Sequence, residues 1–351
     1  MTSFQLTPRT HQVIFGEPMI DVLRRELPRH AQGSYFLITT PGVGRRFEAA
    51  APGDIRERCI GRFADAVAHV PSEVAELACE RAKAAGAKLI LSVGGGSALD
   101  TSKAVAHQLA LPIIAVPTNF SGSEVTFNFG MTVDGVKRTI IDPAVLPHTV
   151  IYDPAMLATL PAEAAICSGV NAMAHAIEAM YAPNANPLTS AIAASGVRHL
   201  VEGLAQRDSQ GTSDANAKCL TGAWLCGEVL AQVGMGLHHR ICHVLGGTFN
   251  LPHAATHTVL LPYSVEFNFG FAPALGALTD LFPDTSLARG LATFSRRLGA
   301  PPSLGELGFR QADIARATQL ALATPLSNPR PVAEGDVREI LVKALSGALP
   351  S

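Results

Sequence analysis

Short apolar runs alternate with helical patterns along the first 150 residues of the chain. Four runs rich in β-branched and aromatic residues, each bounded by turn residues, predict strands at 13–15, 35–39, 88–93 and 112–116. Apolar residues at helical spacing over 71–85 predict a helix before the third of these strands. Strands and helices that alternate in this way predict right-handed βαβ units and a parallel sheet.

A different pattern begins after about residue 155. From Pro161 onward, Ala-rich and Leu-rich segments recur with helical period, separated by proline and glycine at 183–187, 246–252 and 301–302. We therefore expect an α/β N-terminal domain with a parallel, Rossmann-like sheet, followed by an all-α C-terminal domain. The expected boundaries are 1–155 for NAD(P) binding and 156–351 for a helical domain that carries the substrate and catalytic residues.

Composition narrows the possible classes of function. With 48% apolar and 16% charged residues, the 351-residue chain is expected to be a well-packed globular protein. A net charge of −2 does not predict the excess of positive charge that binding to nucleic acid or anionic lipid requires. No apolar stretch predicts a membrane span or a signal peptide. The six cysteines are scattered without C-x-x-C spacing, which predicts free thiols in a reducing cytoplasm.

The strand predicted at 88–93 runs into the sequence GGGS at 94–97, and 98–106 predict a helix. A glycine turn of this kind lets backbone N–H groups approach a phosphate, and the helix N-terminus adds partial positive charge. We expect Ser97 to cap this helix and Asp100 to lie in its first turn. The turn lacks G-x-G-x-x-G spacing and, by itself, is equally compatible with a connection that binds no ligand.

A second loop, PTNFSGSE at 117–124, follows the next predicted strand. Its hydroxyl groups and glycine are expected at the ligand edge of the sheet, because the carboxyl ends of parallel strands share one edge. Two such loops together favour a nucleotide site.

Three polar pairs, each with partners four residues apart, lie between 171 and 257: Asn171/His175, His239/His243 and His253/His257. Residues at i and i+4 share a helix face, so each pair can point at one site. Histidines combined with a side-chain oxygen are typical of a divalent-metal site, although such a site would be expected to use a carboxylate. The pattern therefore leaves open a metal enzyme and a relative that has lost its metal.

Four motifs resemble the iron-containing alcohol dehydrogenase family and occur in the same order over nearly the whole chain. They are GGGSALDTSKA at 94–104, PTNFSGSEVT at 117–126, GVNAMAHAIEA at 169–179 and HRICHVLGGTFNLPHAATHTVLLP at 239–262. The resemblance implies an N-terminal α/β NAD(P)-binding domain and a helical C-terminal domain. The sequences HVP at 69–71, PT-x-x-x-GSE and NPRP at 328–331 are similar to the maleylacetate reductase branch of that family.

The resemblance also implies site residues. In metal-dependent members, one aspartate and three histidines hold iron or zinc, and the matching positions here are Asn171, His175, His239 and His253. An amide is a weaker ligand than a carboxylate, so divalent-metal affinity is expected to fall steeply, and no metal is expected. The expected catalytic residues are His175, His239, His243, His253 and Asn171. His238 is expected to face away from its neighbour and is left out.

The branch implies a small dianionic substrate, maleylacetate, which is reduced at its C=C bond to 3-oxoadipate by a cytoplasmic homodimer. The expected substrate-binding residues are Arg240, His257, Asn119 and Phe120, with Lys103 as a further candidate. The expected cofactor-binding residues are Gly94, Gly95, Gly96, Ser97, Asp100, Thr118, Ser121, Ser123, Val125, Lys137, Thr39 and Thr40. NADH is the expected cofactor, but no acidic residue follows the strand at 35–39, so NADPH stays an alternative.

Other interpretations stay open at this point. Asn171 could still bind metal in an iron- or zinc-dependent alcohol dehydrogenase, or be a helix-start cap. Arg240 is equally compatible with a solvated helix position. A non-catalytic nucleotide-binding module is a more distant alternative. The retained set of histidines argues against it, because a site without a function would be expected to lose some of them. The isolated histidines His107, His148 and His199 are expected to be satisfied core residues.

Overall fold

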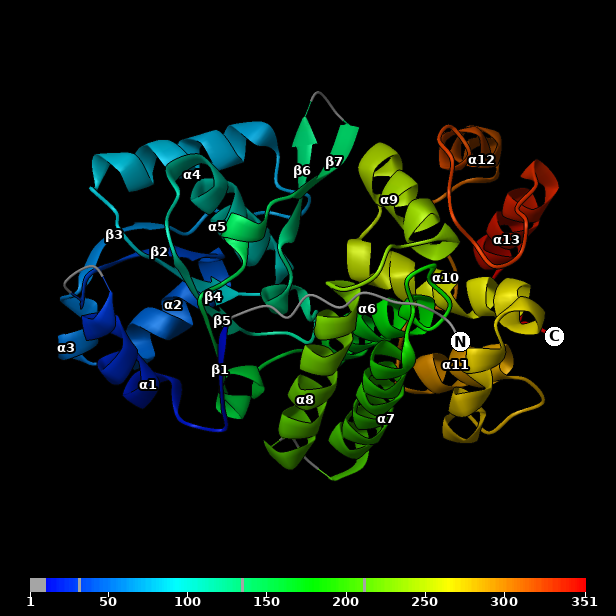
Figure 1. Ribbon diagram of the computed structural model, residues 1–351, viewed down its shortest axis with the longest axis horizontal. Coiled ribbons are helices and arrows are strands. Elements are labelled where there is room, and N and C mark those ends of the chain that lie inside the picture. The colour runs from blue at the N-terminus through cyan, green and yellow to red at the C-terminus, as the bar shows by residue number, and fades with distance from the viewer. Residues whose placement is uncertain (1–10, 31–32, 134–135, 211–212) are drawn as a thin grey trace. The chain divides into compact units, whose positions relative to one another are not determined.

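The structure of the chain is a computed structural model that describes residues 11–30, 33–133, 136–210 and 213–351 (Figure 1). Two compact units divide between Leu160 and Pro161. The first contains a parallel sheet with helices, and the second is built of helices. The expected fold class is therefore confirmed.

A six-stranded parallel sheet forms the N-terminal unit, with the strand order β1-β8-β5-β4-β2-β3. Its strands are β1 (Gln12–Phe15), β2 (Tyr35–Thr39), β3 (Cys59–Phe63), β4 (Ile90–Gly94), β5 (Ile113–Pro117) and β8 (Thr149–Tyr152). The four expected strands correspond to β1, β2, β4 and β5. The outer strand β3 and the four-residue β8 were not predicted, nor was the antiparallel hairpin of β6 (Asn128–Val133) and β7 (Val136–Ile141).

Helices cover both faces of the sheet, because successive residues of its buried central strands point to opposite sides. The helices α1 (Met19–Glu26), α2 (Pro41–Ala50) and α3 (Gly53–Arg56) share one core with alternate residues of β2, β4 and β5. The helices α4 (Ser72–Ala84) and α5 (Gly96–Leu109) lie on the opposite face (Figure 1). This double cover leaves the loops at the carboxyl edge of the strands as the accessible polar part of the sheet.

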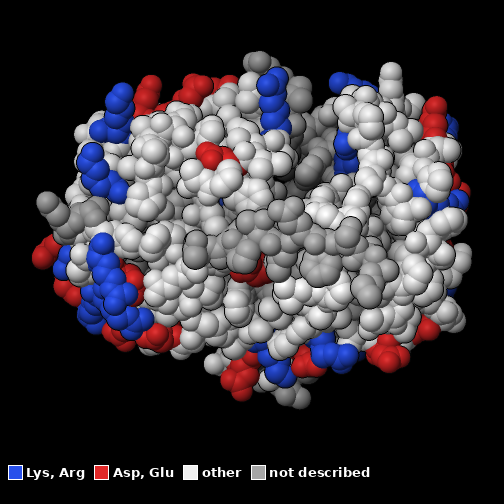
Figure 2. All heavy atoms as spheres, in the orientation of Figure 1, with Lys and Arg blue, Asp and Glu red and all other residues white. Residues whose placement is uncertain are grey.

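Charged side chains on the surface are mixed in sign. On the face drawn in Figure 2, basic and acidic groups lie beside one another around α1 and α3, where Arg24 pairs with Asp54 and Arg25 with Glu17. Within the described residues, no helix has the length and apolar character needed to cross a membrane.

The C-terminal unit contains eight α-helices within its described residues. They are α6 (Ala162–Ala179), α7 (Pro187–Gln210), α8 (Ser213–Leu230), α9 (Leu237–Phe249), α10 (His253–Asn268), α11 (Leu287–Arg297), α12 (Ile314–Ala321) and α13 (Glu334–Ser346). The sequence predicted that a helix ends at Gly246, but α9 continues to Phe249. It ends at Asn250, whose backbone is left-handed. Every residue of α6 from Ala165 to Ala179 is buried, so the polar side chains of this helix must find partners inside the unit.

Candidate active site

The glycine loop after β4 and the loop after β5 lie side by side at the carboxyl edge of the sheet. Gly94 is paired with Pro117, and the N–H of Thr118 donates to the carbonyl of Gly94 across 3.1 Å. A Cβ atom on Gly95 would lie 2.5 Å from the amide nitrogen of Asn119, so that side chain closes over the glycine. The two loops therefore form one continuous surface.

The start of α5 next to this surface can hold a phosphate. Its N-cap is Gly95 and no side chain caps it, which corrects the expectation that Ser97 is the cap. Nothing lies within 4 Å of the place where a Cβ on Gly96 would be. Uncapped N–H groups of a helix N-terminus beside open space fit the pyrophosphate of a dinucleotide.

The other expected cofactor residues fall into two groups. Thr40, Ser121 and Ser123 are half-buried, and the hydroxyl groups of the two serines lie 3.2 Å apart. Asp100 accepts a hydrogen bond from the N–H of Gly130, and Thr118 is 8% exposed. By contrast, three residues expected to contact ligands are almost fully buried: Thr39, Phe120 and Val125. Their side chains pack inside the unit, because they end or follow strands covered on both faces. Lys137 belongs to β7, but its side chain lies outside the described residues.

Lys103 does not have the position expected for a partner of a substrate carboxylate. Its ammonium group is buried and donates to the carbonyls of Ser123 and Asn128 and to the hydroxyl group of Thr126, at 2.7 to 2.9 Å. Burial lowers its pKa to about 8. All three donors are used to join α5 to the end of the second loop and to the segment that leads into β6, so this lysine has a structural role.

In the C-terminal unit, six histidines from α6, α9 and α10 form a network of ring contacts. Ring centroids lie 5.2 Å apart for His175 and His239, and 4.8 Å for His239 and His257. They lie 4.4 Å apart for His253 and His257, and 6.2 Å for His243 and His253. The structure thus brings together the histidines that spacing singled out, and we call these six residues, with Asn171 and Glu178, the histidine cluster.

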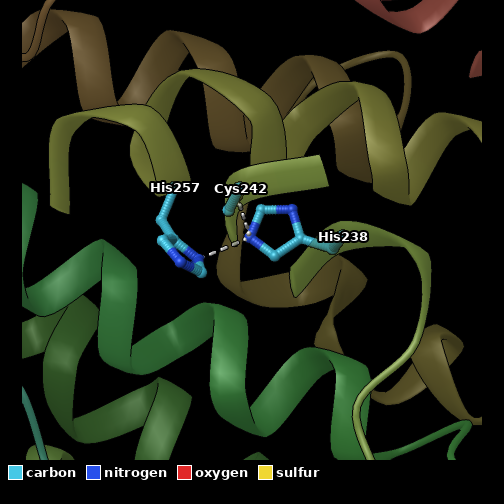
Figure 3. A group of neighbouring side chains, drawn as sticks. All are labelled: His238, Cys242 and His257. Atoms are coloured by element: carbon cyan, nitrogen blue, oxygen red, sulfur yellow. Dashed lines mark hydrogen bonds between the residues drawn. The ribbon is translucent and has the colours of Figure 1, made fainter. Parts of the chain in front are cut away.

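His238 is the sixth histidine, and its place in the network corrects the expectation that it faces away. Its Nε2 lies 2.9 Å from Nδ1 of His257 and 3.7 Å from the sulfur of Cys242 (Figure 3). Its Nδ1 lies 3.1 Å from the hydroxyl oxygen of Ser264. The main partner is on α10, so spacing along α9 could not reveal it.

Burial divides the cluster into an inner and an outer part. His175, His238, His239 and His257 are at most 5% exposed, whereas His243 and His253 are half-buried. Burial, reinforced by the neighbouring imidazoles, lowers the pKa of His238 to about 3 and holds the pKa values of His175 and His257 well below their usual range. These three inner histidines are therefore neutral at pH 7.

Several buried polar atoms of the inner part have no hydrogen-bond partner among the residues that the structure describes. They are Oδ1 of Asn171, Nδ1 of His175, Nε2 of His239 and Nε2 of His257. Asn171 lies in the middle of α6, so it is not the helix-start cap that was considered. Because buried polar atoms are nearly always paired, these atoms mark a place where a polar ligand can bind.

Glu178 is a member of the cluster that the sequence did not reveal. One oxygen of its carboxylate lies 2.5 Å from Nδ1 of His239, and the other accepts the backbone N–H of His238 across 2.8 Å. Burial raises the pKa of Glu178, but the adjacent His239 and further hydrogen bonds outweigh this, so the net shift is downward. Its position three residues after His175 in HAIE was the available signal.

Some expected residues lie apart from the cluster. The guanidinium group of Arg240 binds the hydroxyl group of Thr324 and the carbonyl of Pro325, which places it on the outer side of α9. His107 and His148 are exposed, contrary to the core positions expected, and His107 pairs with Asp142 at 2.6 Å.

The donors present do not fit the divalent metal of the metal-dependent relatives. The four matching positions supply three imidazoles and the neutral amide of Asn171, without a carboxylate. Among the described residues, one group of three His, Cys, Asp or Glu side chains has donor atoms that all lie within 4.8 Å of one another. This group is His238, Cys242 and His257. The matched set of His175, His239 and His253 does not meet this condition.

Comparison with known proteins gives matches along almost the whole chain. The description iron-containing alcohol dehydrogenase matches residues 10–154, and the C-terminal part of the Fe-containing alcohol dehydrogenase family matches 165–345. The chain is 39% identical to maleylacetate reductase of Burkholderia cepacia, over all of both chains. Its structure is similar to that of maleylacetate reductase from Rhizobium sp. strain MTP-10005, with a TM-score of 0.90, 40% identity and full coverage of both chains. An iron-containing alcohol dehydrogenase from Corynebacterium glutamicum also gives a TM-score of 0.90, with 36% identity over 100% of this chain and 99% of that one. The chain therefore belongs to the iron-containing alcohol dehydrogenase family.

Proposed function

We propose that this protein is a maleylacetate reductase that reduces the C=C bond of maleylacetate to 3-oxoadipate with NADH or NADPH. Relatives of that name, between 36% and 40% identical over almost their whole length, support the proposal. The observation that carries it is the buried neutral amide of Asn171, one helical turn from the buried imidazole of His175, at a position matched with a carboxylate in metal-dependent members. Such donors suit a developing enolate better than a divalent cation.

The reaction sets two tasks for the protein. The cofactor, when bound, supplies a hydride to one carbon of the C=C bond that is conjugated with the ketone of maleylacetate. The π electrons move to the ketone oxygen as an enolate, and a proton added to the neighbouring carbon restores the ketone. The protein must therefore hold a negative oxygen and deliver one proton.

The two parts of the histidine cluster suit these two tasks. Nδ1 of His175, which is buried without a partner among the described residues, can present an N–H group to the enolate oxygen, while Nε2 of His239 and Oδ1 of Asn171 can accept hydrogen bonds that orient the substrate. His243 and His253 are half-buried, so solvent can return a proton to them after each turnover. We assign the proton donor to this outer pair.

The N-terminal unit is proposed to bind the cofactor, and the C-terminal unit the substrate. Gly95, Gly96 and the free N–H groups at the start of α5 surround the pyrophosphate, which also benefits from the helix dipole. Thr118, Ser121 and Ser123 line the phosphate or adenine side. Thr40 stands where NAD-selective relatives would carry an acidic residue, so both cofactors are accepted.

The test is NADH oxidation with maleylacetate, using protein treated exhaustively with a chelator and analysed for residual metal. We expect full activity and 3-oxoadipate as the product, identified by mass. Chelated protein without activity towards maleylacetate, even after metal is restored, would refute the function.

A metal-dependent alcohol dehydrogenase is the second candidate, and the full-length similarity to the iron-containing alcohol dehydrogenase from Corynebacterium glutamicum favours it. Oxidation of simple alcohols that disappears on chelation and returns with iron or zinc would establish this alternative. Alcohol oxidation that is absent both with and without added metal would exclude it.

We also infer a cytoplasmic homodimer. None of the six cysteines, Cys59, Cys79, Cys167, Cys219, Cys226 and Cys242, forms a disulfide with another described residue, as expected for a reducing compartment. Sedimentation analysis of the purified protein tests the dimer.

A further inference from the structure

We propose that Glu178 is a positioning residue of the active site, which fixes the ring and the tautomer of His239 from behind. The inference deepens the proposed function and rests on it, since it assigns how an imidazole of the proposed substrate site is held.

Glu178 grips two consecutive residues of α9 with its two carboxylate oxygens. Oε1 accepts the N–H of His238, which is one of the backbone donors that the first turn of a helix cannot satisfy internally. Oε2 accepts the Nδ1–H of the next residue, His239, across 2.5 Å. The carboxylate is therefore both the cap of α9 and the partner of the ring, and its charge is favoured at a helix N-terminus.

The surroundings leave this carboxylate little freedom. Glu178 is 1% exposed on the fully buried part of α6. At Gly236, the N-cap of α9, an added Cβ would lie 2.9 Å from the carbonyl of Ser327 and 3.1 Å from Oε1 of Glu178. The glycine thus allows the α9 backbone to approach the carboxylate closely enough for both hydrogen bonds.

The grip decides which nitrogen of His239 meets the substrate. A carboxylate only accepts hydrogen bonds, so Nδ1 of His239 must carry a proton, and Nε2 is the atom left without a protein partner. The carboxylate thus leaves Nε2 as the ring nitrogen of His239 that can meet a ligand.

The position of the carboxylate also explains how a site with Asn171 keeps a negative charge. Glu178 follows Asn171 by seven residues, or about two helical turns, and so lies on the same side of α6. Glu178 thus places a negative charge on the side of α6 that carries the neutral amide of Asn171.

The first test compares Glu178→Gln with Glu163→Gln, which makes the same change at an exposed position of α6. The amide introduced by Glu178→Gln can accept the N–H of His238, but its NH₂ group then faces Nδ1 of His239 and reverses that hydrogen bond. We expect kcat with maleylacetate to fall about 100-fold, with KM and NADH affinity nearly unchanged and the pH profile of kcat displaced. Glu178→Asp should recover part of kcat, because it retains the charge.

A Glu178→Gln enzyme that is as active as Glu163→Gln, with the same pH profile, would overturn the proposal. So would equal losses in the Gln and Asp variants, since a purely steric role does not depend on charge.

The second test needs no substrate, which separates this inference from the proposed function. In protein labelled with ¹⁵N-histidine, we expect a strongly downfield Nδ1–H proton resonance that is lost in His239→Gln and in Glu178→Gln. An unprotonated Nδ1 of His239 in the wild-type protein would refute the proposed hydrogen bond to Glu178, whatever the substrate. If this resonance is present but maleylacetate is not reduced, the function fails and the grip stands.

Discussion

The hydroxyl group of Thr39 donates a hydrogen bond of 2.7 Å to the carbonyl oxygen of Val93 and so links the last residue of β2 to β4. This bond and complete burial engage Thr39 in the sheet. The next residue, Thr40, is half-buried at the N-cap of α2 without a side-chain cap. We therefore propose that Thr40, and not Thr39, is the side chain at the end of β2 that meets a cofactor ribose.

Thr40→Asp is predicted to reduce the use of NADPH. A carboxylate at this position repels a 2′-phosphate and accepts a hydrogen bond from a free 2′-hydroxyl group. We expect the ratio of kcat/KM for NADH over NADPH to rise about 10-fold, equivalent to roughly 1.4 kcal/mol. Thr40→Asn is the control without charge, and an unchanged ratio in the aspartate variant would place the ribose elsewhere.

Gly95→Ala is predicted to weaken cofactor binding. The new methyl group would lie 2.5 Å from the amide nitrogen of Asn119, whose Oδ1 accepts the N–H of Ser121. The asparagine must move and disturb the second loop, so we expect the dissociation constant of NADH to rise about 10-fold. Fluorescence titration measures it, and Gly53→Ala, where the Cβ meets only a distant side-chain atom at 3.8 Å, is the control. Adding Asn119→Ala should restore binding if the clash is the cause.

The elements that sequence predicted are those whose burial follows a simple rule. In each of β2, β4 and β5, all five residues are buried, so each strand could be recognised in the sequence as a continuous apolar run. In the outer strand β3, exposed Ile60 and Arg62 alternate with less exposed residues, and the strand contains a glycine. Its sequence therefore resembles that of a turn and did not predict a strand. Hydrophobic pattern alone therefore identified the centre of the sheet more readily than its edge.

The same limit explains which site residues were found. Pairs such as His253 and His257 are neighbours on one helix, and spacing reports neighbours of this kind. His238 and Glu178 have their partners 19 and 61 residues away, on other helices. Such contacts depend on how the helices pack, which spacing along the chain does not determine.

Asn171→Asp is predicted to raise the affinity for zinc or iron. It restores a carboxylate to the position matched with a metal ligand, one helical turn from His175, so attraction to a divalent cation increases. We expect at least about a 100-fold gain, measured by calorimetry and by metal content after dialysis. Asn250→Asp makes the same change at an exposed position and should bind no more metal than the wild type. An Asn171→Asp protein that remains metal-free in excess zinc would show that the match of Asn171 with the ligand position is wrong.

His175→Ala and His243→Ala are predicted to damage catalysis and spare cofactor binding. The first removes a buried nitrogen proposed to hold the enolate, and the second a half-buried proton donor. We expect kcat to fall by about 10² to 10⁴, with NADH affinity almost unchanged, because both residues belong to the C-terminal unit. His199→Ala, outside the cluster, is the control. Unaltered turnover in both variants would remove the histidines from the mechanism.

The buried imidazole of His238 is predicted to make the protein acid-sensitive. Burial lowers its pKa from 6.5 to about 3, so the folded protein keeps it neutral over a range in which the unfolded chain takes up a proton. Stability linked to this residue is therefore complete above about pH 6.5 and is lost as pH falls towards 3, by up to about 1.4 kcal/mol per pH unit. The lowered pKa values of His175 and His257 act in the same direction.

Urea unfolding near pH 7, 6 and 5 tests this prediction. His238→Gln retains an amide that can bind Ser264 or His257 but has no proton to gain, so its unfolding free energy should decline less steeply with falling pH than that of the wild type. His199→Gln, at a half-buried position outside the cluster, is expected to follow the wild-type slope. Equal slopes in all three proteins would mean that His238 is protonated in the folded state. The ring of His238 is buried, lies 2.9 Å from Nδ1 of His257 and has no carboxylate partner among its described hydrogen bonds. A positive charge on this ring would therefore lack a stabilising partner, which is why the structure predicts a neutral His238.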